Sequence, residues 1–442
     1  MKRKAYHGRA VSVLLAVMLA LAMLAGCGGG GDAQTDSGQA ADSGQAADSG
    51  QANDGATSIK IGFVAPFSGP MATFTVGARY TADEALAIIN ADGGIEVDGR
   101  TLPVEVIWGD SESDATKASE VATKLVTSDK VDILVGEWTP ATTSPVTVVG
   151  ERNGVPTILA NGPDTSWLEG GPFTWSWGLF FDYNKFIDEY FNGWDRMETN
   201  KKIGLVLDSH VDGVGMAEIM KAKAGDRGYT IVDPGRFPEG TMDYTQVLSQ
   251  IQREGCDILV ASLLTPELIQ VWNQCQQLGY VPKTAVLSKG LHFANDALAL
   301  GEGKGQGITI ETQWSPKFPF KSSLSGKTAQ QLSDEFEAAL NQSPDLGLGW
   351  DWTLFDVIAD VLERAGSLDK EKINQAFAET DLDCTYGRIV FAENHVGYCP
   401  IVFGQWVEDE KWGYKKNILA AGHVPEITEF SEPVYIPGYK PL

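Results

Sequence analysis

The sequence has few of the side chains that most often perform catalysis or bind metals. Its 442 residues include only 5 histidines and 5 cysteines. The histidines are scattered, and neither a His-Glu-x-x-His nor a Gly-x-Ser-x-Gly motif occurs. The cysteine spacings match no zinc-binding pattern. We therefore expect a protein that is not an enzyme and that needs neither a metal nor a cofactor.

Positive charge is also scarce. The chain has 34 Lys and Arg against 59 Asp and Glu, which gives a formal net charge of −25 at pH 7. A chain of this charge repels a phosphate backbone, so nucleic acid is not an expected partner.

Long apolar runs are missing from all but the first 26 residues. Four basic residues there accompany an apolar stretch from Val11 to Ala25, about fifteen residues long and short for a membrane span. A basic start, a short apolar core and small residues at its end are typical of a secretory signal. We predict such a signal over residues 1–26.

The residues Leu24-Ala25-Gly26-Cys27 resemble the lipobox of bacterial lipoproteins. In that family the cysteine is diacylated and becomes the mature N-terminus, so the resemblance implies a membrane lipid anchor at Cys27. Each buried methylene of an acyl chain stabilises the attachment by roughly 0.8 kcal/mol. The alternative is an ordinary signal peptide cut at a small residue, with Cys27 incidental.

Residues 27–57 hold almost no large apolar side chain. The sequence Asp-Ser-Gly-Gln-Ala-Ala repeats from Asp36 to Ala47 and begins again at Asp48. Such a segment cannot bury enough apolar surface to offset the entropy lost on ordering. We predict a disordered linker that holds an extracytoplasmic protein clear of a membrane face.

From residue 58 onward, strand and helix patterns alternate. The segment Ser58–Pro66 has the period of a strand, and helical spacing follows from Thr75 to Ala91. A second block with the same alternation begins at Lys202. Strict alternation predicts parallel sheets with helices on both faces, and two blocks predict two α/β lobes. A hairpin of Tyr386–Phe391 with Pro400–Val407 is expected near the end.

Ligands of open α/β sheets bind at the carboxyl ends of the strands. This rule selects loops of both blocks, so a molecule held between the lobes would touch all of them. The selected loops are 66–75, 136–142, 160–165, 208–213, 263–267 and 288–292.

The order of motifs after residue 58 resembles the substrate-binding proteins of branched-chain amino acid and amide ABC transporters. The resemblance is carried by Pro66-Phe-Ser-Gly-Pro70 with its following helix, by Gly154-Val-Pro156, by Thr265-Pro-Glu267 and by the helix that ends at Gly366. It implies the two-lobed α/β fold of the type I periplasmic binding proteins, with the ligand in the cleft between the lobes.

The resemblance also implies how the chain is divided. The expected parts are the signal 1–26, the anchored linker 27–57, a first lobe of residues 58–178 and 314–385, and a second lobe of residues 179–313 and 386–442.

The function implied is capture of a small polar solute by lobe closure and its delivery to an ABC permease. The solute would be a branched-chain or other amino acid, an amide or an amine, and the protein would act as a monomer. A ligand favours closure only if it contacts both lobes. The alternative is a sensor that presents its ligand to a membrane receptor, because the fold alone does not separate the two functions.

The family's ligand contacts carry over only in part. Phe74 matches an aromatic residue in the first loop, and Thr139 lies where the family grips an α-carboxylate, although Pro140 removes one N–H group. Asn161-Gly162 stand where the family has a threonine.

In the second lobe Asp212 replaces a tyrosine, and Glu267 keeps the acid that pairs with an α-ammonium group. Acids that face aromatic rings also suit an amine or amide. Each residue has a structural alternative, such as core packing for the aromatic residues or a solvated side chain for Lys289. The predicted contacts are Ser68, Phe74, Trp138, Thr139, Pro140, Ala141, Asn161, Gly162, Phe180, Asp212, Glu267 and Lys289.

Four further cysteines form an even set in a chain that we expect to be exported, where disulfides are allowed. Cys384 and Cys399 flank the predicted hairpin and are the favoured pair. Cys256 starts a strand and Cys275 lies late in the returning helix, so this pair is also possible.

Overall fold

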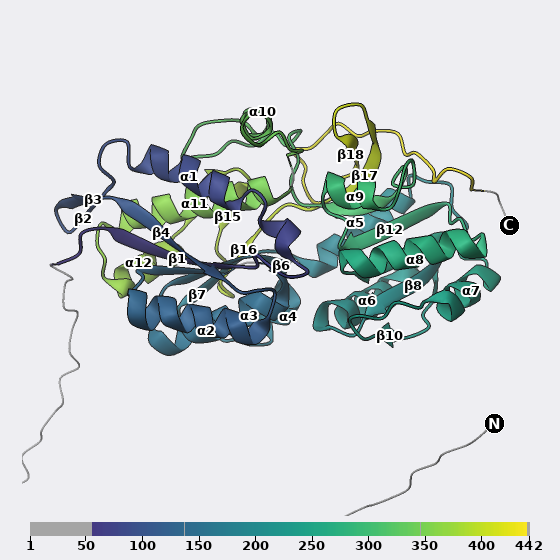
Figure 1. Ribbon diagram of the computed structural model, residues 1–442, viewed down its shortest axis with the longest axis horizontal. Helices are drawn as coiled ribbons and strands as arrows, with labels where there is room; N and C mark the ends of the chain where they lie inside the picture. The colour runs from purple at the N-terminus through teal and green to yellow at the C-terminus, as the bar shows by residue number, and fades with distance from the viewer. Residues whose placement is uncertain (1–54, 137, 345, 440–442) are drawn as a thin grey trace, which may run out of the picture. The chain divides into compact units, whose positions relative to one another are not determined.

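The computed structural model describes residues 55–439, except 137 and 345. The predicted signal, Cys27 and all but the end of the predicted linker lie outside the described residues. Two large sheets, each flanked by helices, form the described part of the chain (Figure 1). We call each sheet with its helices a lobe.

The first lobe contains a six-stranded sheet in which every neighbouring pair is parallel. Its strands, from edge to edge, are β16 (Val396–Tyr398), β7 (Ser176–Phe181), β6 (Thr157–Pro163), β5 (Ile133–Gly136), β1 (Ile59–Ala65) and β4 (Val104–Asp110).

Helices cover both faces of this sheet (Figure 1). One face carries α1 (Ala78–Ile89), α11 (Leu346–Ala365) and α12 (Lys370–Ala378), and the other carries α2 (Ala115–Lys124), α3 (Thr139–Asn153) and α4 (Asp164–Leu168). Strand β1 is nearly all apolar because both of its faces are buried, with Phe63 in one core cluster and Val64 in the other.

The second lobe contains a larger sheet that is parallel except where β13, β17 and β18 pair antiparallel. Its strands are β10 (Arg236–Phe237), β8 (Lys202–Asp208), β11 (Ile258–Leu263), β12 (Thr284–Lys289), β13 (Thr309–Thr312), β17 (Val402–Asp409) and β18 (Gly413–Ala420), with β9 (Thr230–Val232) beside β8.

Two groups of helices pack on this second sheet, in two separate core clusters. The helices α5 (Tyr183–Trp194) and α6 (Val211–Ala224) form one group, and α7 (Thr245–Arg253), α8 (Thr265–Leu278) and α9 (Ala294–Ala299) form the other. The remaining elements are α10 (Ala329–Leu340), the short helices η1 (Ala72–Thr75), η2 (Leu125–Asp129) and η3 (Gly225–Arg227), and the strand pairs β2 (Ile95–Val97) with β3 (Arg100–Leu102) and β14 (Asp381–Cys384) with β15 (Gly387–Val390).

The chain crosses between the sheets three times. The first crossing follows β7, which ends at Phe181, and the second follows β13, which ends at Thr312. The third lies between β16 and β17, although the sequence placed it at residue 386. The physical reason is that residues 396–398 add a parallel strand to the first sheet, where Val396 pairs with Gly178.

The predicted C-terminal hairpin has different partners in the structure. Strand β15 pairs with β14, whereas β17 pairs with β13 and β18. Local apolar patterns identify strands but do not specify which strands pair, and this is why the predicted pairing is wrong.

The structure does not contain the predicted disulfides. All four cysteines among the described residues are buried free thiols. Cys384 donates instead to the Gly387 carbonyl oxygen at 3.2 Å, and Cys399 donates to the Gly397 carbonyl oxygen at 3.8 Å. Burial raises the pKa of Cys275 to about 12. Such thiols stay protonated at neutral pH and are poor nucleophiles.

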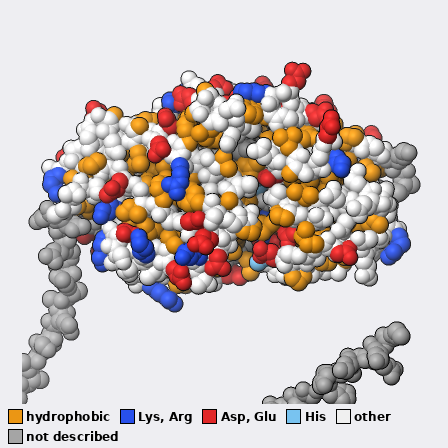
Figure 2. Space-filling model, in the orientation of Figure 1, with side chains coloured by type: hydrophobic (Ala, Val, Ile, Leu, Met, Phe, Trp, Pro, Cys, Tyr) orange, Lys and Arg blue, Asp and Glu red, His pale blue; other side chains and the backbone are white. Residues whose placement is uncertain are grey.

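Acidic and basic side chains are interspersed over the described part of the face seen in Figure 2. The negative charge of the chain is therefore not gathered into one patch there. Within the described residues, none of the helices combines the length and the apolarity that a bilayer crossing requires.

Candidate ligand site

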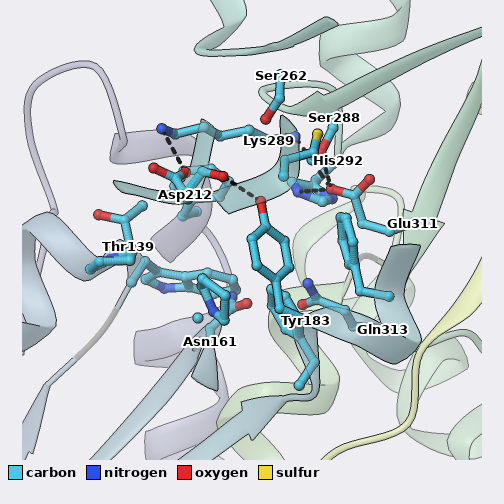
Figure 3. A pocket seen from close by; sticks show the side chains of 18 residues that line it. Thr139, Asn161, Tyr183, Asp212, Ser262, Ser288, Lys289, His292, Glu311 and Gln313 are labelled. Atoms are coloured by element: carbon cyan, nitrogen blue, oxygen red, sulfur yellow. Dashed lines mark hydrogen bonds and ion pairs between the residues drawn. The ribbon is translucent and has the colours of Figure 1, made fainter. Parts of the chain in front are cut away.

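The carboxyl ends of strands from both lobes converge on one cavity, which we call the inner pocket (Figure 3). It has an empty volume of about 540 Å³, which includes space open to solvent. The first lobe and the first crossing supply Phe74, Trp138, Thr139, Pro140, Asn161, Gly162, Pro163 and Phe181. The second lobe supplies Tyr183, Phe186, Asp212, Met216, Ser262, Ser288, Lys289, His292, Glu311 and Gln313.

Aromatic rings form two walls of this pocket. Phe74 and Trp138 stack with ring centroids 5.2 Å apart and an interplanar angle of 15°. Phe181, Tyr183 and Phe186 form a second group, with centroid separations between 5.2 and 6.2 Å. The rings offer flat apolar faces to a bound molecule.

Three charged side chains form what we call the ion group. The Lys289 ammonium lies 2.7 Å from Asp208 Oδ2 and 2.9 Å from Asp212 Oδ2. Burial lowers the pKa of Lys289, but the negative charges of Asp212 and Asp208 outweigh it and hold that pKa above its usual value. For Asp212, Lys289 outweighs burial and lowers the pKa, so the pair is ionised at neutral pH.

Glu311 is a buried carboxylate that accepts three hydrogen bonds. One oxygen accepts from Tyr190 at 2.6 Å, and the other accepts from Ser288 at 2.9 Å and from the Lys289 backbone N–H at 3.3 Å. His292 Nε2 lies 3.2 Å from this second oxygen. Burial raises the pKa of Glu311. These hydrogen bonds hold the β12 loop in place and engage both oxygens of Glu311.

His292 is neutral at physiological pH, because burial lowers the pKa of His292 to about 3. The contact with Glu311 assigns the hydrogen to Nε2. The pocket therefore contains no imidazolium charge.

Two buried donors at the pocket have no acceptor within the described part of the chain: Trp138 Nε1 and Asn161 Nδ2. Trp138 is 3% exposed and Asn161 is 7% exposed. A buried donor without an acceptor costs about 1–3 kcal/mol. A ligand with acceptor atoms would remove this cost.

Three pocket residues that are not glycine have left-handed backbone conformations. Their φ angles are +46° at Thr139, +68° at Asn161 and +71° at Lys289. Each such conformation costs of order 1–3 kcal/mol and is typical of functional sites, where it re-aims a side chain.

A wider outer pocket adjoins the inner one. Both pockets are lined by Thr139, Pro140, Asp212 and Lys289. The outer pocket is also lined by Ala141, Asp208, His210, Glu239 and Glu267. The Glu267 carboxylate accepts from the Gly240 N–H at 2.5 Å and the Leu264 N–H at 3.1 Å, and so it caps α8.

The structure brings together most of the residues that the sequence singled out. Those that line the inner pocket are Phe74, Trp138, Thr139, Pro140, Asn161, Gly162, Asp212 and Lys289.

Ala141 and Glu267 line only the outer pocket. Ser68 lines neither pocket and donates instead to Asp110 at 2.8 Å.

Phe180 lies on the opposite face of β7, where it packs edge-on against Trp167 at 5.2 Å. Side chains alternate along a strand, so Phe181 lines the pocket in its place. The strand pattern did not determine which of the two adjacent phenylalanines faces the cavity.

Several pocket residues were missed, for two reasons. Ser288 and His292 lie in the selected loop 288–292, from which only the charged residue Lys289 was predicted as a contact. Glu311 and Gln313 lie on and just after β13, a strand that the apolar pattern did not predict. Within the described residues, no group of His, Cys, Asp and Glu side chains is arranged to hold a metal ion.

Comparison with known proteins gives one family match. Residues 58–411 match a family model described as periplasmic binding protein. A Leu/Ile/Val-binding protein homolog of Brucella melitensis is 25% identical over 260 residues, and the match covers 58% of this chain but 63% of that protein, less than two thirds of its length. A leucine-, isoleucine-, valine-, threonine- and alanine-binding protein of Pseudomonas aeruginosa is 26% identical, and the match covers 76% of this chain and 87% of that protein.

Solved structures share the fold. A branched-chain amino acid transporter substrate-binding protein of Streptococcus pneumoniae, in complex with isoleucine, has a TM-score of 0.70, 22% identity and coverage of 82% of this chain and 99% of that chain. A solute-binding protein of Rhodopseudomonas palustris, in complex with 3,4-dihydroxybenzoic acid, has a TM-score of 0.67 and 15% identity. This match covers 87% of this chain and 99% of that chain. At these identities the likeness establishes the fold alone, and it confirms the predicted two-lobed α/β fold.

Proposed function

Since the chain belongs to the periplasmic binding protein family, as its motifs predicted, we propose that it is the extracytoplasmic solute-binding component of an ABC importer. The inner pocket is the observation that carries this proposal. Its walls come from both lobes, so a bound solute contacts both. A ligand of that kind favours the closed form, which a permease can distinguish from the open form.

The proposed solute is a small organic molecule with an apolar body and polar groups. The relatives are named for branched-chain amino acids, and the two solved neighbours hold isoleucine and an aromatic acid. The proposed solute classes are a branched-chain or other amino acid, an amide and an amine. One monomer supplies every residue of the pocket.

The proposal is binding without catalysis. The ion group is internally neutralised in part, His292 is neutral, and Glu311 is hydrogen-bonded to Tyr190 and Ser288. The charged groups of the cavity therefore position one another, which supports binding without catalysis.

The decisive experiment purifies the full-length protein from its own membranes and measures its mass under native conditions. We expect a small solute that leaves unchanged when the protein unfolds. Adding that solute back to solute-free protein should reduce the radius of gyration in solution scattering, because the lobes close. A protein without any solute, or one that releases a chemically altered product, would contradict solute capture.

The proposed anchor is tested by Cys27→Ser, with Ser37→Ala in the linker as the matched control. We expect labelled fatty acid to be incorporated into the parent protein and the control but not into Cys27→Ser. Equal incorporation in Cys27→Ser would show that the lipid is attached elsewhere. Loss of solute uptake on gene deletion would support transport, whereas unchanged uptake with a lost cellular response would favour the sensor alternative.

A further inference from the structure

The inner pocket already contains an ammonium group, which belongs to Lys289. We propose that Lys289 takes the place of a ligand ammonium, so that the site binds a small carbonyl compound without a cationic group. The class comprises carboxylates and carboxamides with a flat apolar body. This inference rests on the proposed function, because it names the solute class of the same pocket.

Both carboxylates of the ion group already contact an ammonium group, that of Lys289. Asp208 and Asp212 each direct Oδ2 at Lys289, over 2.7 and 2.9 Å. The other oxygen of Asp208 accepts from the His210 N–H at 3.1 Å. All three side chains of the ion group are at most 15% exposed, so water screens these contacts little.

The position of Lys289 is fixed by the fold. Its backbone N–H donates to Glu311, and its left-handed φ of +71° re-aims the side chain at the end of β12. In Figure 3 the ammonium and Asp212 lie on the side of the cavity across from Asn161. Because Lys289 lines both pockets, a second ammonium in the inner pocket would meet its charge at short range.

The acid predicted to pair with an α-ammonium does not reach the inner pocket. Glu267 lines only the outer pocket, and its two oxygens accept from the Gly240 and Leu264 N–H groups. Glu311 already accepts hydrogen bonds from Tyr190, from Ser288 and from the Lys289 N–H. An amino acid or amine would therefore bury its ammonium without a free carboxylate, which is unfavourable.

The unpartnered donors point to what the ligand carries instead. Trp138 Nε1 and Asn161 Nδ2 are buried, line the inner pocket and have no acceptor among residues 55–439 as described. Helix α3 begins at Thr139, directly after Trp138 in the sequence. The N-terminal end of a helix carries a partial positive charge, which also favours an acceptor. A carbonyl oxygen has two lone pairs and supplies acceptors to these donors, whereas an ammonium group supplies none.

Aromatic walls alone would also attract a cation. In this pocket, however, Asp208 and Asp212 already contact the Lys289 ammonium. The position that a ligand ammonium would take beside these carboxylates is therefore occupied. The stacked pair of Phe74 and Trp138 then serves the flat apolar part of the ligand.

The test uses the full-length protein and matched series of ligands in titration calorimetry. One series is 4-methylpentanoate, 4-methylpentanamide, leucine and 3-methylbutylamine, and the other is benzoate, benzamide and benzylamine. We expect the best carboxylate or carboxamide to bind at least about tenfold more tightly than any ligand with an ammonium group. The ratio of carboxylate to carboxamide affinity separates the two members of the class.

Tighter binding of leucine or of either amine would overturn the inference and leave solute capture intact. Absence of binding in both series would also overturn it, while the native mass and scattering measurements would still decide the proposed function. The two failures are therefore distinguishable.

Two variants test the role of Lys289 directly. Lys289→Met frees Asp208 and Asp212, so we expect the preference to move by at least about tenfold toward ammonium ligands. Asp212→Asn retains the ammonium with one carboxylate fewer, so carboxylates should gain affinity relative to carboxamides. Lys124→Met, which removes an exposed lysine paired with Asp129 at 2.8 Å, is the matched control. Ratios unchanged in both pocket variants would contradict the inference.

Discussion

The phenolic oxygen of Tyr183 donates a hydrogen bond to the backbone carbonyl oxygen of Asp212 over 2.6 Å. Tyr183 begins α5 directly after the first crossing, and its backbone N–H donates to Asp164 of the first lobe at 3.1 Å. One residue thus connects α4 of the first lobe to the ion group of the second. The rotation of one lobe on the other must change the geometry of at least one of these two contacts.

Tyr183→Phe should weaken solute binding by about fivefold to tenfold, because a hydrogen bond contributes about 1 kcal/mol and the Asp212 turn loses its support. The measurement is titration calorimetry with the identified solute, combined with solution scattering of the solute-free protein. Tyr435→Phe, which removes a hydroxyl that accepts from Glu198 at the surface, is the control and should bind normally. Equal affinities in both variants would refute a role for Tyr183 in closure.

Trp138→Phe separates the indole donor from the aromatic face. Because Trp138 Nε1 has no acceptor among the described residues, its removal should not lower the stability of the solute-free protein through a lost hydrogen bond. Solute affinity should fall by about tenfold, since the ligand loses a donor. Trp412→Phe is the control, because that indole donates to Glu337 at 3.1 Å. Unchanged affinity in Trp138→Phe would exclude the indole as a ligand contact.

The sequence predicted the two-lobed architecture and the loops of the site for one physical reason. In parallel sheets buried on both faces, alternating strand and helix patterns place every strand's carboxyl end on the ligand side. The loops that follow these strands therefore contain Phe74, Asn161 and Lys289, which meet in one cavity.

What could not be predicted depends on contacts between distant segments. The ion group joins the loop after β8 to the end of β12, and neither local sequence shows that Lys289 is neutralised. The third crossing was misplaced because β16 is only three residues long, too short for a periodic pattern. The left-handed φ angle at Thr139 has no sequence signature, because a β-branched residue rarely adopts this conformation.

Two helical glycines should respond oppositely to alanine. A Cβ at Gly193 of α5 would lie 1.8 Å from the ring of Phe403, so Gly193→Ala should destabilise the protein by about 1–3 kcal/mol. Gly225 has helical angles and no atom within 4 Å of the added Cβ, so Gly225→Ala should stabilise by roughly 0.4–1 kcal/mol. Urea unfolding of both variants checks the signs. A loss of stability at both sites would contradict the distinction between them.

Asp296 should make stability fall as the pH rises. Its carboxylate accepts from the Phe293 N–H at 3.2 Å at the start of α9, and burial raises the pKa of Asp296 to about 7. In the unfolded chain the same carboxyl loses its proton near pH 3.9. Between these values the folded state binds the extra proton, so stability falls by at most about 1.4 kcal/mol per pH unit as the pH rises from about 4 to 7.

Asp296→Asn keeps the acceptor but has no proton to lose. Its stability relative to the parent protein should therefore increase between pH 4 and 7 and then level off. His292 acts in the opposite sense, because its pKa of about 3 removes stability as the pH falls below about 6.5. Subtracting the two unfolding curves cancels the His292 contribution, since both proteins contain it. Asp226→Asn, at an exposed carboxyl, is the control for the substitution itself. A flat difference between Asp296→Asn and the parent protein would mean that Asp296 is ionised in the folded protein throughout.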